Sequence, residues 1–409
     1  MLRFPSRSLG VVLGLAVLVV APDPLAAASR GRTPAPDALG PWAVGRSTFE
    51  AVDPTRDDGR ALTVDVWYPV DPADAGGAFS RYDLLLTFIE SEVALDAPPP
   101  SARGPFPLVV FSHGNGGIRF QSFFLCEALA SHGFVVVAPD HTGNTAIDLL
   151  LGSSDPFAKS AVDRPLDVSF LITTMLERSA DPADEFHRRI DPRRVGVSGH
   201  SFGGFTSLAV AAGFVLAPPD PRVRAIVPIA PASSIFDDEA LASIRIPTLI
   251  LGGTLDETTP VEPESARPYA LVAARPRYRV DVLGAGHGSF TEICAIVDAL
   301  VLVGIPPEVA GLLLGELAEA CGPDLIPIGE AQRLTNLYAI AFLKRFVALD
   351  PRYERWLTPG LAKRGRLAVD LFRVSGGGKK PVASPWPAYS GSRRATGASA
   401  AAQGRGVGR

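Results

Sequence analysis

Short apolar runs that suit β-strands alternate with longer helical stretches from residue 44 to about residue 350. Several of the later runs are continuous and rich in Val and Ile, as strands buried on both faces are. This alternation predicts an α/β fold, in which helices cover both faces of a mostly parallel sheet. We expect eight strands, at residues 44–52, 62–68, 107–111, 134–138, 194–197, 223–229, 247–251 and 279–283.

The first two runs differ from the others because their apolar and polar residues alternate, which predicts an antiparallel pair at the edge of the sheet. Helical periodicity follows most of the later runs. The predicted helices cover residues 119–132, 161–179, 202–213, 262–274 and 330–348.

The chain has 409 residues, which suits one large α/β domain with additions. We place this domain at residues 44–350, after a linker at 29–43 and before a C-terminal extension at 351–373. Two insertions interrupt the alternation, at residues 71–104 and 289–329. Each insertion either covers a binding pocket or simply packs on the domain.

The N-terminal 28 residues have the pattern of a signal peptide. Arg3 and Arg7 precede an apolar run at residues 9–21, and three alanines at 26–28 form a small-residue cleavage site. The run is shorter than the roughly 18 residues of a membrane span. We therefore expect a periplasmic or secreted protein without a membrane span after cleavage; an uncleaved anchor is the alternative.

Charge is distributed unevenly along the chain. Residues 29–373 hold 31 Lys and Arg and 42 Asp and Glu, a net charge of −11. This balance argues against nucleic acid as a partner and against polyanionic substrates. Residues 374–409 hold six basic residues, no acidic residue and much Gly, Ser and Ala, which predicts a disordered basic tail.

The chain has three cysteines. Cys126 lies in a predicted amphipathic helix, where a small buried thiol is common. Cys294 and Cys321 lie 27 residues apart in the second insertion, and in an exported protein a disulfide between them would stabilise the fold by about 3 kcal/mol. Two independent buried thiols are the alternative. No Cys or His cluster has the spacing of metal ligands, so we expect no metal.

The strongest functional motif is Gly199-His200-Ser201-Phe202-Gly203, which follows a predicted strand and opens a predicted helix. A nucleophile elbow has this context, because its serine lies on a tight strand-to-helix turn that flanking glycines make possible. The motif predicts Ser201 as a nucleophile. The first amides of the helix would then face the negative charge that develops in the reaction.

A serine nucleophile needs a base and an acid, which in this fold follow in the order acid, then histidine. His287 is the one histidine after Ser201, and it lies in a Gly-rich loop after a strand. Asp256 lies between them, where an apolar strand meets a turn, and would hold His287 in the required tautomer. Other acids in this interval suit the role less well: Asp237 and Asp238 lie far past their strand, and Asp281 lies inside a strand, where we expect it to face solvent.

The loop after the strand at 107–111 reads Ser112-His113-Gly114-Asn115-Gly116-Gly117. Glycines there let the backbone approach a substrate oxygen closely. We predict that the amides of Asn115 and Phe202 form an oxyanion hole and that His113 is structural. A nucleotide-binding loop has another pattern, so we expect no cofactor.

Over about residues 44–350 the chain resembles the α/β-hydrolase superfamily. The segments Phe111-Ser112-His113-Gly114 and Gly199-His200-Ser201-Phe202-Gly203-Gly204, together with the segment at 130–134, look like the platelet-activating-factor acetylhydrolase and dienelactone-hydrolase-like group. In the acetylhydrolases the residues after the His-Gly pair and after the nucleophile supply the two oxyanion amides. The corresponding residues here are Asn115 and Phe202.

The chain departs from that group in two respects. The acetylhydrolases place their acid soon after the strand that follows the nucleophile, and residues 229–233 hold no acid. The segment 247–287 instead resembles bacterial cutinases and polyester hydrolases, with Asp256, Pro260 and His287 at matching places. Dienelactone hydrolases use a Cys nucleophile, where this chain has Ser201.

These features together predict an exported serine hydrolase that cleaves a small-molecule or lipid-like carboxylic ester. A peptidase of the prolyl-oligopeptidase kind shares the fold and the triad, but residues 29–100 are too few for its usual accessory domain. A binding protein that keeps the fold without the activity is the other alternative. The sequence does not define the oligomeric state.

Overall fold

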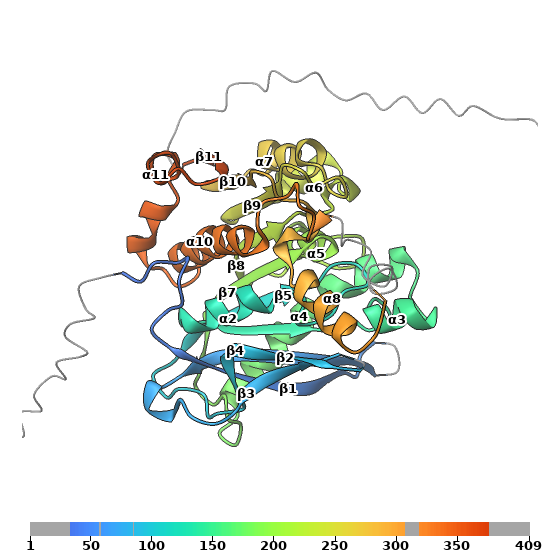
Figure 1. Ribbon diagram of the computed structural model, residues 1–409, viewed down its shortest axis with the longest axis vertical. Coiled ribbons are helices and arrows are strands. Elements are labelled where there is room, and N and C mark those ends of the chain that lie inside the picture. The colour runs from blue at the N-terminus through green and yellow to red at the C-terminus, as the bar shows by residue number, and fades with distance from the viewer. Residues whose placement is uncertain (1–32, 57–58, 85, 307–318, 376–409) are drawn as a thin grey trace, which may run out of the picture. The chain divides into compact units, whose positions relative to one another are not determined.

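A computed structural model describes residues 33–56, 59–84, 86–306 and 319–375 of the chain (Figure 1). Their strands are β1 (Ala43–Asp53), β2 (Arg60–Val70), β3 (Phe79–Asp83), β4 (Phe88–Asp96), β5 (Phe106–Ser112), β6 (Val135–Pro139), β7 (Ile190–His200), β8 (Val223–Ile229), β9 (Thr248–Gly253), β10 (Arg277–Val282) and β11 (Val369–Val374). The α-helices are α2 (Phe123–Ser131), α3 (Ala146–Leu151), α4 (Phe157–Ala180), α5 (Phe202–Ala212), α6 (Asp238–Ser243), α7 (Arg267–Leu271), α8 (Ile293–Leu302), α10 (Ile328–Phe346) and α11 (Pro359–Gly365). Shorter helical turns are η1 (Pro72–Asp74), η2 (Ser233–Ile235), η3 (Glu262–Ala266), η4 (His287–Phe290) and η6 (Pro351–Trp356).

All the described strands form one sheet in the order β11-β10-β9-β8-β7-β5-β6-β2-β1-β4-β3. The six strands from β10 to β6 are parallel to their neighbours. The α/β fold predicted from the sequence is confirmed, and each of the eight expected strands is present. The sheet is larger than expected, however, because β3, β4 and β11 bring the number of described strands to eleven.

The strands β1 and β2 pair antiparallel over their whole length, from Ala43 opposite Val70 to Asp53 opposite Arg60. Their predicted place at the edge of the sheet is wrong. The insertion at 71–104 folds into the hairpin β3–β4, and β4 adds to β1 in parallel. At the other edge, the C-terminal extension ends in β11, which pairs antiparallel with β10.

Helices cover both faces of the sheet and define two cores. Along β5 the buried side chains alternate between them, since Val109 and Phe111 lie in one core and Leu108 and Val110 in the other. The helices α2 and α10 pack on the first face. The helices α4, α5 and α6 pack on the second. The carboxyl ends of the parallel strands therefore meet at one edge, where an open α/β sheet binds its ligands.

The second insertion contributes α8, which packs through Ile293, Ile296 and Val297 against a small cluster that includes Ile89 of β4. A disulfide joins Cys294 on α8 to Cys321. Cys126 is a buried free thiol on α2, as expected. The predicted signal peptide at 1–28 and almost all of the predicted tail at 374–409 lie outside the described residues. Within the described part of the chain, no helix combines the length and the apolar character that crossing a membrane requires.

Candidate active site

Ser201 lies between the end of β7 and the start of α5, at the carboxyl edge of the sheet. Its φ and ψ are 58° and −117°, a strained conformation for a residue with a side chain. The flanking glycines make this turn possible. A Cβ atom on Gly203 would lie 1.8 Å from the Ser112 carbonyl oxygen, and one on Gly199 would lie 2.4 Å from the Gly203 oxygen. The motif thus forms the tight turn that its spacing predicts.

His287 and Asp256 form a buried hydrogen-bonded pair. The distance from His287 Nδ1 to Asp256 Oδ2 is 2.8 Å. An ionised carboxylate only accepts hydrogen bonds, so Nδ1 carries the proton and Nε2 is the nitrogen that can take another. Thr259 also fixes the carboxylate, because its amide donates to Oδ1 at 2.6 Å and its hydroxyl donates to Oδ2 at 2.8 Å. This geometry suits a general base and its orienting acid.

Contacts made by His200 link the histidine loop to the serine. The His200 ring lies 4.6 Å from the His287 ring, between centroids, and its Nε2 lies 3.0 Å from the His287 carbonyl oxygen. His200 directly precedes Ser201, whose own carbonyl accepts the amide of Ala232 at 3.2 Å. The structure therefore brings Ser201, Asp256 and His287 to the same edge of the sheet.

The loop after β5 lies against the serine. A Cβ atom on Gly114 would lie 3.5 Å from the Ser201 Cβ. His113 is buried and structural: its Nδ1 donates to the Gly114 oxygen at 2.7 Å, and its Nε2 accepts the amide of His141 at 3.1 Å. Burial, and then the charge of Arg164, hold the pKa of His113 well below its usual range, so the ring is neutral.

The two predicted oxyanion donors directly follow the two residues that meet here, Gly114 and Ser201. Asn115 follows Gly114 in the loop, and Phe202 is the first residue of α5. Neither backbone amide has a protein acceptor among the described residues. The first amides of a helix have no partner within it, so the Phe202 amide is available to a ligand.

Gln121 is a supporting residue that the sequence did not reveal. Its Oε1 accepts the Gly114 amide at 2.9 Å, and its Nε2 donates to His200 Nδ1 at 2.8 Å. His200 then carries its proton on Nε2 and donates to the His287 carbonyl. Gln121 and His200 thus connect the loop after β5 to the histidine loop. Burial, together with the neighbouring His287, holds the pKa of His200 well below its usual range.

Glu319 is a second such residue, and it comes from the second insertion. Its carboxylate accepts the amides of Glu257 at 3.0 Å and His287 at 3.3 Å, and the Thr258 hydroxyl at 2.9 Å. The disulfide lies two residues further on, at Cys321. No motif marks Glu319, because its partners lie about 30 and 60 residues away in the sequence.

The other acids between Ser201 and His287 have different partners. Asp237 caps α6 through the Ala240 amide at 2.7 Å, and Asp238 pairs with Arg267 at 2.6 Å. The expectation that Asp281 faces solvent is wrong: it is 4% exposed. The antiparallel strand β11 covers this edge of β10, and Asp281 pairs with Arg279 at 2.8 Å. Burial raises the pKa of Asp281 to about 6, although Arg279 partly offsets the effect.

Four aromatic residues of the first core divide into two groups. Trp67 and Phe120 are buried in the core. Phe123 and Phe124 line a cavity of about 400 Å³ next to Glu127. Neither Ser201 nor His287 lines that cavity. In the described ranges no group of three or more His, Cys, Asp or Glu residues has an arrangement that could hold a metal ion.

Comparisons with known proteins show which proteins the chain is similar to. Residues 99–300 match a family model described as PET hydrolase-like. The chain is 28% identical to Cutinase 2 of Thermobifida cellulosilytica over 263 residues, which are 64% of this chain and 76% of the cutinase. It is 22% identical over 380 residues to the platelet-activating factor acetylhydrolase of Cavia porcellus, covering 80% and 81% of the two chains. A solved ferulic acid esterase from Streptomyces cinnamoneus matches with a TM-score of 0.60 and 25% identity, over 81% of this chain and 96% of that one.

The sheet, its two helical layers and these matches define an α/β-hydrolase. The similarity to cutinases, to an acetylhydrolase and to a ferulic acid esterase shows that the chain is a carboxylic ester hydrolase. The resemblance inferred from its motifs is confirmed.

Proposed function

We propose that the chain hydrolyses carboxylic esters with a catalytic triad of Ser201, His287 and Asp256. The observation that carries this proposal is the buried 2.8 Å pair between His287 Nδ1 and Asp256, which His200 links to the adjacent Ser201 on its strained strand-to-helix turn. We also propose that the backbone amides of Asn115 and Phe202 form the oxyanion hole.

The reaction proceeds in two halves. His287 Nε2 takes the Ser201 proton as Oγ attacks the ester carbonyl, and the amides of Asn115 and Phe202 bind the oxyanion of the tetrahedral intermediate. The intermediate collapses, and His287 delivers its proton to the leaving alcohol. Water, activated by His287, then attacks the acyl-enzyme and releases the carboxylic acid and free Ser201. Asp256 stabilises the imidazolium in both halves.

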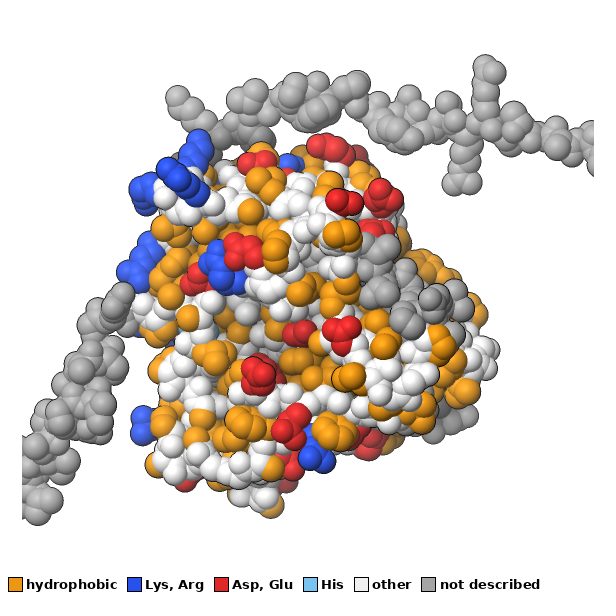
Figure 2. Space-filling model, viewed as in Figure 1, with side chains coloured by type: hydrophobic (Ala, Val, Ile, Leu, Met, Phe, Trp, Pro, Cys, Tyr) orange, Lys and Arg blue, Asp and Glu red, His pale blue; other side chains and the backbone are white. Residues whose placement is uncertain are grey.

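Residues around the site favour an uncharged ester with apolar groups. Leu149 of α3 packs against Gly116, and Phe157 stacks on Phe202 with 4.9 Å between ring centroids. Both side chains are more than half exposed, so they are available to a substrate. Acidic side chains lie among apolar ones on the face shown in Figure 2, and basic ones gather toward its left edge. An acidic body repels polyanionic substrates.

We also propose that the protein acts outside the cytoplasm. The signal-like residues 1–28 support this location, and so does the disulfide between Cys294 and Cys321, since disulfides persist in oxidising compartments. Fractionation of the producing cell, with N-terminal sequencing of the mature protein, tests the location. A cytoplasmic protein that begins at Met1 contradicts it.

The triad is tested with Ser201→Ala on p-nitrophenyl butyrate and with a fluorophosphonate probe. The variant should lose activity by at least about 10³-fold and should not be labelled. Ser207→Ala is a matched control, because Ser207 lies six residues further along the chain in α5 and its hydroxyl donates to the Gly203 carbonyl at 3.0 Å. Wild-type turnover by folded Ser201→Ala refutes the triad. The same experiment on butyryl amides tests the peptidase alternative.

A further inference from the structure

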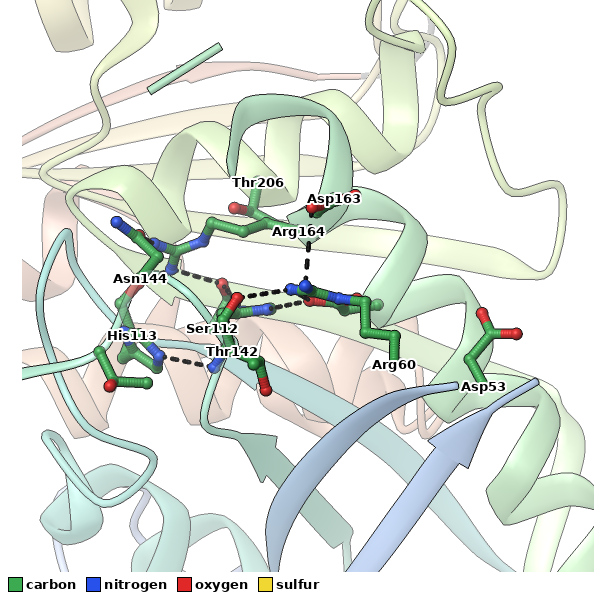
Figure 3. A network of polar contacts seen from close by, with 12 residues as sticks. Asp53, Arg60, Ser112, His113, Thr142, Asn144, Asp163, Arg164 and Thr206 are labelled. Carbon is green, nitrogen blue, oxygen red and sulfur yellow. Dashed lines mark hydrogen bonds and ion pairs between the residues drawn. The ribbon is translucent and has the colours of Figure 1, made fainter. Parts of the chain in front are cut away.

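Arg164 of α4 is fully buried beneath the loop after β5. Its guanidinium donates to the carbonyls of His113 and Gly114, the latter at 3.2 Å, and to Ser112 Oγ at 3.1 Å. It also donates to Asn144 Oδ1 at 2.6 Å. Figure 3 shows this side chain extending from its helix toward Asn144 and Ser112. One side chain therefore fixes two consecutive carbonyls directly before Asn115.

The same guanidinium reaches both residues that we propose as oxyanion donors. Through Asn144 it orients Asn115, because Asn144 Nδ2 donates to Asn115 Oδ1 at 2.9 Å. Its central carbon lies 4.6 Å from the centroid of the Phe202 ring. Asn115 and Phe202 belong to different elements, and Arg164 is the side chain that connects them.

The positive charge of Arg164 has no direct anionic partner in the described part of the chain, since its acceptors are all neutral. It reaches Asp167 only through Ser112 and His141, which are 2.9 Å apart. Asp167 already binds Arg56 and Arg60, each at 2.7 Å. Burial lowers the pKa of Arg164 to about 9, so it stays charged at neutral pH.

A buried cation without a carboxylate partner is costly to the fold. The fold could satisfy the same carbonyls with neutral donors at lower cost, so stability alone does not explain a charge here. A negative oxyanion on the other side of the loop does explain it, because preorganised positive charge in a site of low dielectric stabilises the transition state strongly.

We propose that Arg164 is the positioning residue of the oxyanion hole. It holds the peptide groups at 113 and 114 so that the Asn115 amide points to the substrate oxygen, it fixes the start of α5 through the Phe202 ring, and its charge favours the oxyanion. This inference rests on the proposed triad and oxyanion hole, and it assigns their electrostatic support to a side chain outside the triad.

The test compares Arg164→Lys and Arg164→Met with Arg277→Lys in the purified full chain. Arg277 is a matched control: it is also buried, donates to the Val272 carbonyl at 2.7 Å and lies against Tyr269, but it lies at the amino end of β10, away from the site. Each variant is assayed for kcat and KM on p-nitrophenyl butyrate and for inhibition by a trifluoromethyl ketone, which forms a tetrahedral oxyanion adduct on the serine. Thermal melting and circular dichroism report folding.

We expect Arg164→Met to lower kcat by about 100-fold and Arg164→Lys by about 10-fold, with KM within about threefold of the wild type. The inhibition constant of the ketone should rise by the same factors. Arg277→Lys should lose stability without losing kcat. A folded Arg164→Met variant with wild-type kcat and wild-type ketone affinity overturns the proposal, and so does a loss of stability alone.

If neither Arg164 variant folds, Asn144→Ala tests the positioning role of Arg164. It cuts the contact between Arg164 and Asn115 and should lower kcat about 10-fold at unchanged KM; wild-type kcat in this variant overturns the proposal. Ser201→Ala distinguishes a failure of the proposed triad from a failure of the proposed role of Arg164. Activity in Ser201→Ala refutes the proposed function itself, whereas an inactive Ser201→Ala beside a fully active Arg164→Met refutes only the role of Arg164.

Discussion

Replacing Asp281 with Asn should stabilise the protein and leave its activity intact. Asp281 is buried on β10 beside Arg279, and burial raises its pKa from 3.8 to about 6. The folded state thus binds the Asp281 proton more tightly than the unfolded state does. Below about pH 4 the group is protonated in both states, and its ionisation has no effect on stability.

The cost of ionising Asp281 grows as pH rises from 4 to 6 and is complete above pH 6. A shift of about two pKa units corresponds to about 3 kcal/mol, at 1.36 kcal/mol per unit. This value already includes the attraction of Arg279, because the pKa reflects every neighbour. Asn resembles the neutral acid in shape, so Asp281→Asn should gain about 3 kcal/mol at pH 8, or about 5 °C in Tm.

The assay is thermal melting of wild type and Asp281→Asn at pH 5 and pH 8, with kcat on p-nitrophenyl butyrate. Asp256→Asn is the matched control. It should lose about 10⁴-fold in kcat, because His287 then adopts the wrong tautomer. A gain in Tm that is equal at the two pH values, or absent at pH 8, refutes the electrostatic argument. Loss of activity in Asp281→Asn refutes the choice of Asp256 as the acid.

Three further substitutions test the support of the site. Glu319→Gln removes the charge that binds the His287 and Glu257 amides and should lower kcat about 10-fold. Partial burial alone would raise the pKa of Glu319, but its hydrogen bonds hold that pKa below the usual range. The carboxylate's contribution should therefore be present above the ordinary pKa of a glutamate and fade as pH falls below it, as a kcat profile against pH will show. Gln121→Leu frees the Gly114 amide and should lower kcat about 10-fold with a smaller change in Tm; an unchanged kcat contradicts the link to His200. Gly203→Ala places a Cβ 1.8 Å from the Ser112 oxygen and should cost more than about 3 kcal/mol in urea unfolding, whereas a wild-type midpoint contradicts that clash.

The core of the fold was predictable because its signals are local. The buried strands β5, β6, β8 and β9 read as largely apolar runs, and Gly199 and Gly203 mark the turn at Ser201. The order of Ser201, Asp256 and His287 along the chain follows from the way parallel strands bring their carboxyl ends together. These predictions needed only short segments and the topology of one sheet.

The strands that escaped prediction lie at the edges of the sheet. β3 has only five residues, and neither β3 nor β4 has the continuous apolar run of a strand buried on both faces. β11 follows α11 and is half exposed. Asp281 was misjudged for the same reason, since β10 is an edge strand only until β11 covers it. Pairing between distant segments decides each of these outcomes, and no local pattern encodes it.

The supports of the site escaped prediction for a different physical reason. Arg164, Gln121 and Glu319 act on backbone amides and carbonyls, which every residue in a loop possesses. The residues that receive this support therefore carry no distinguishing side chain, and the residues that give it lie on other elements. It follows that side chains around the serine can be replaced to suit a different ester, provided that Arg164, Gln121 and Glu319 keep the loop backbone in place. Substitutions at Leu149, which is half exposed and lies against Gly116, should then act on substrate preference more than on kcat, whereas substitutions at Arg164 should act on kcat for every ester.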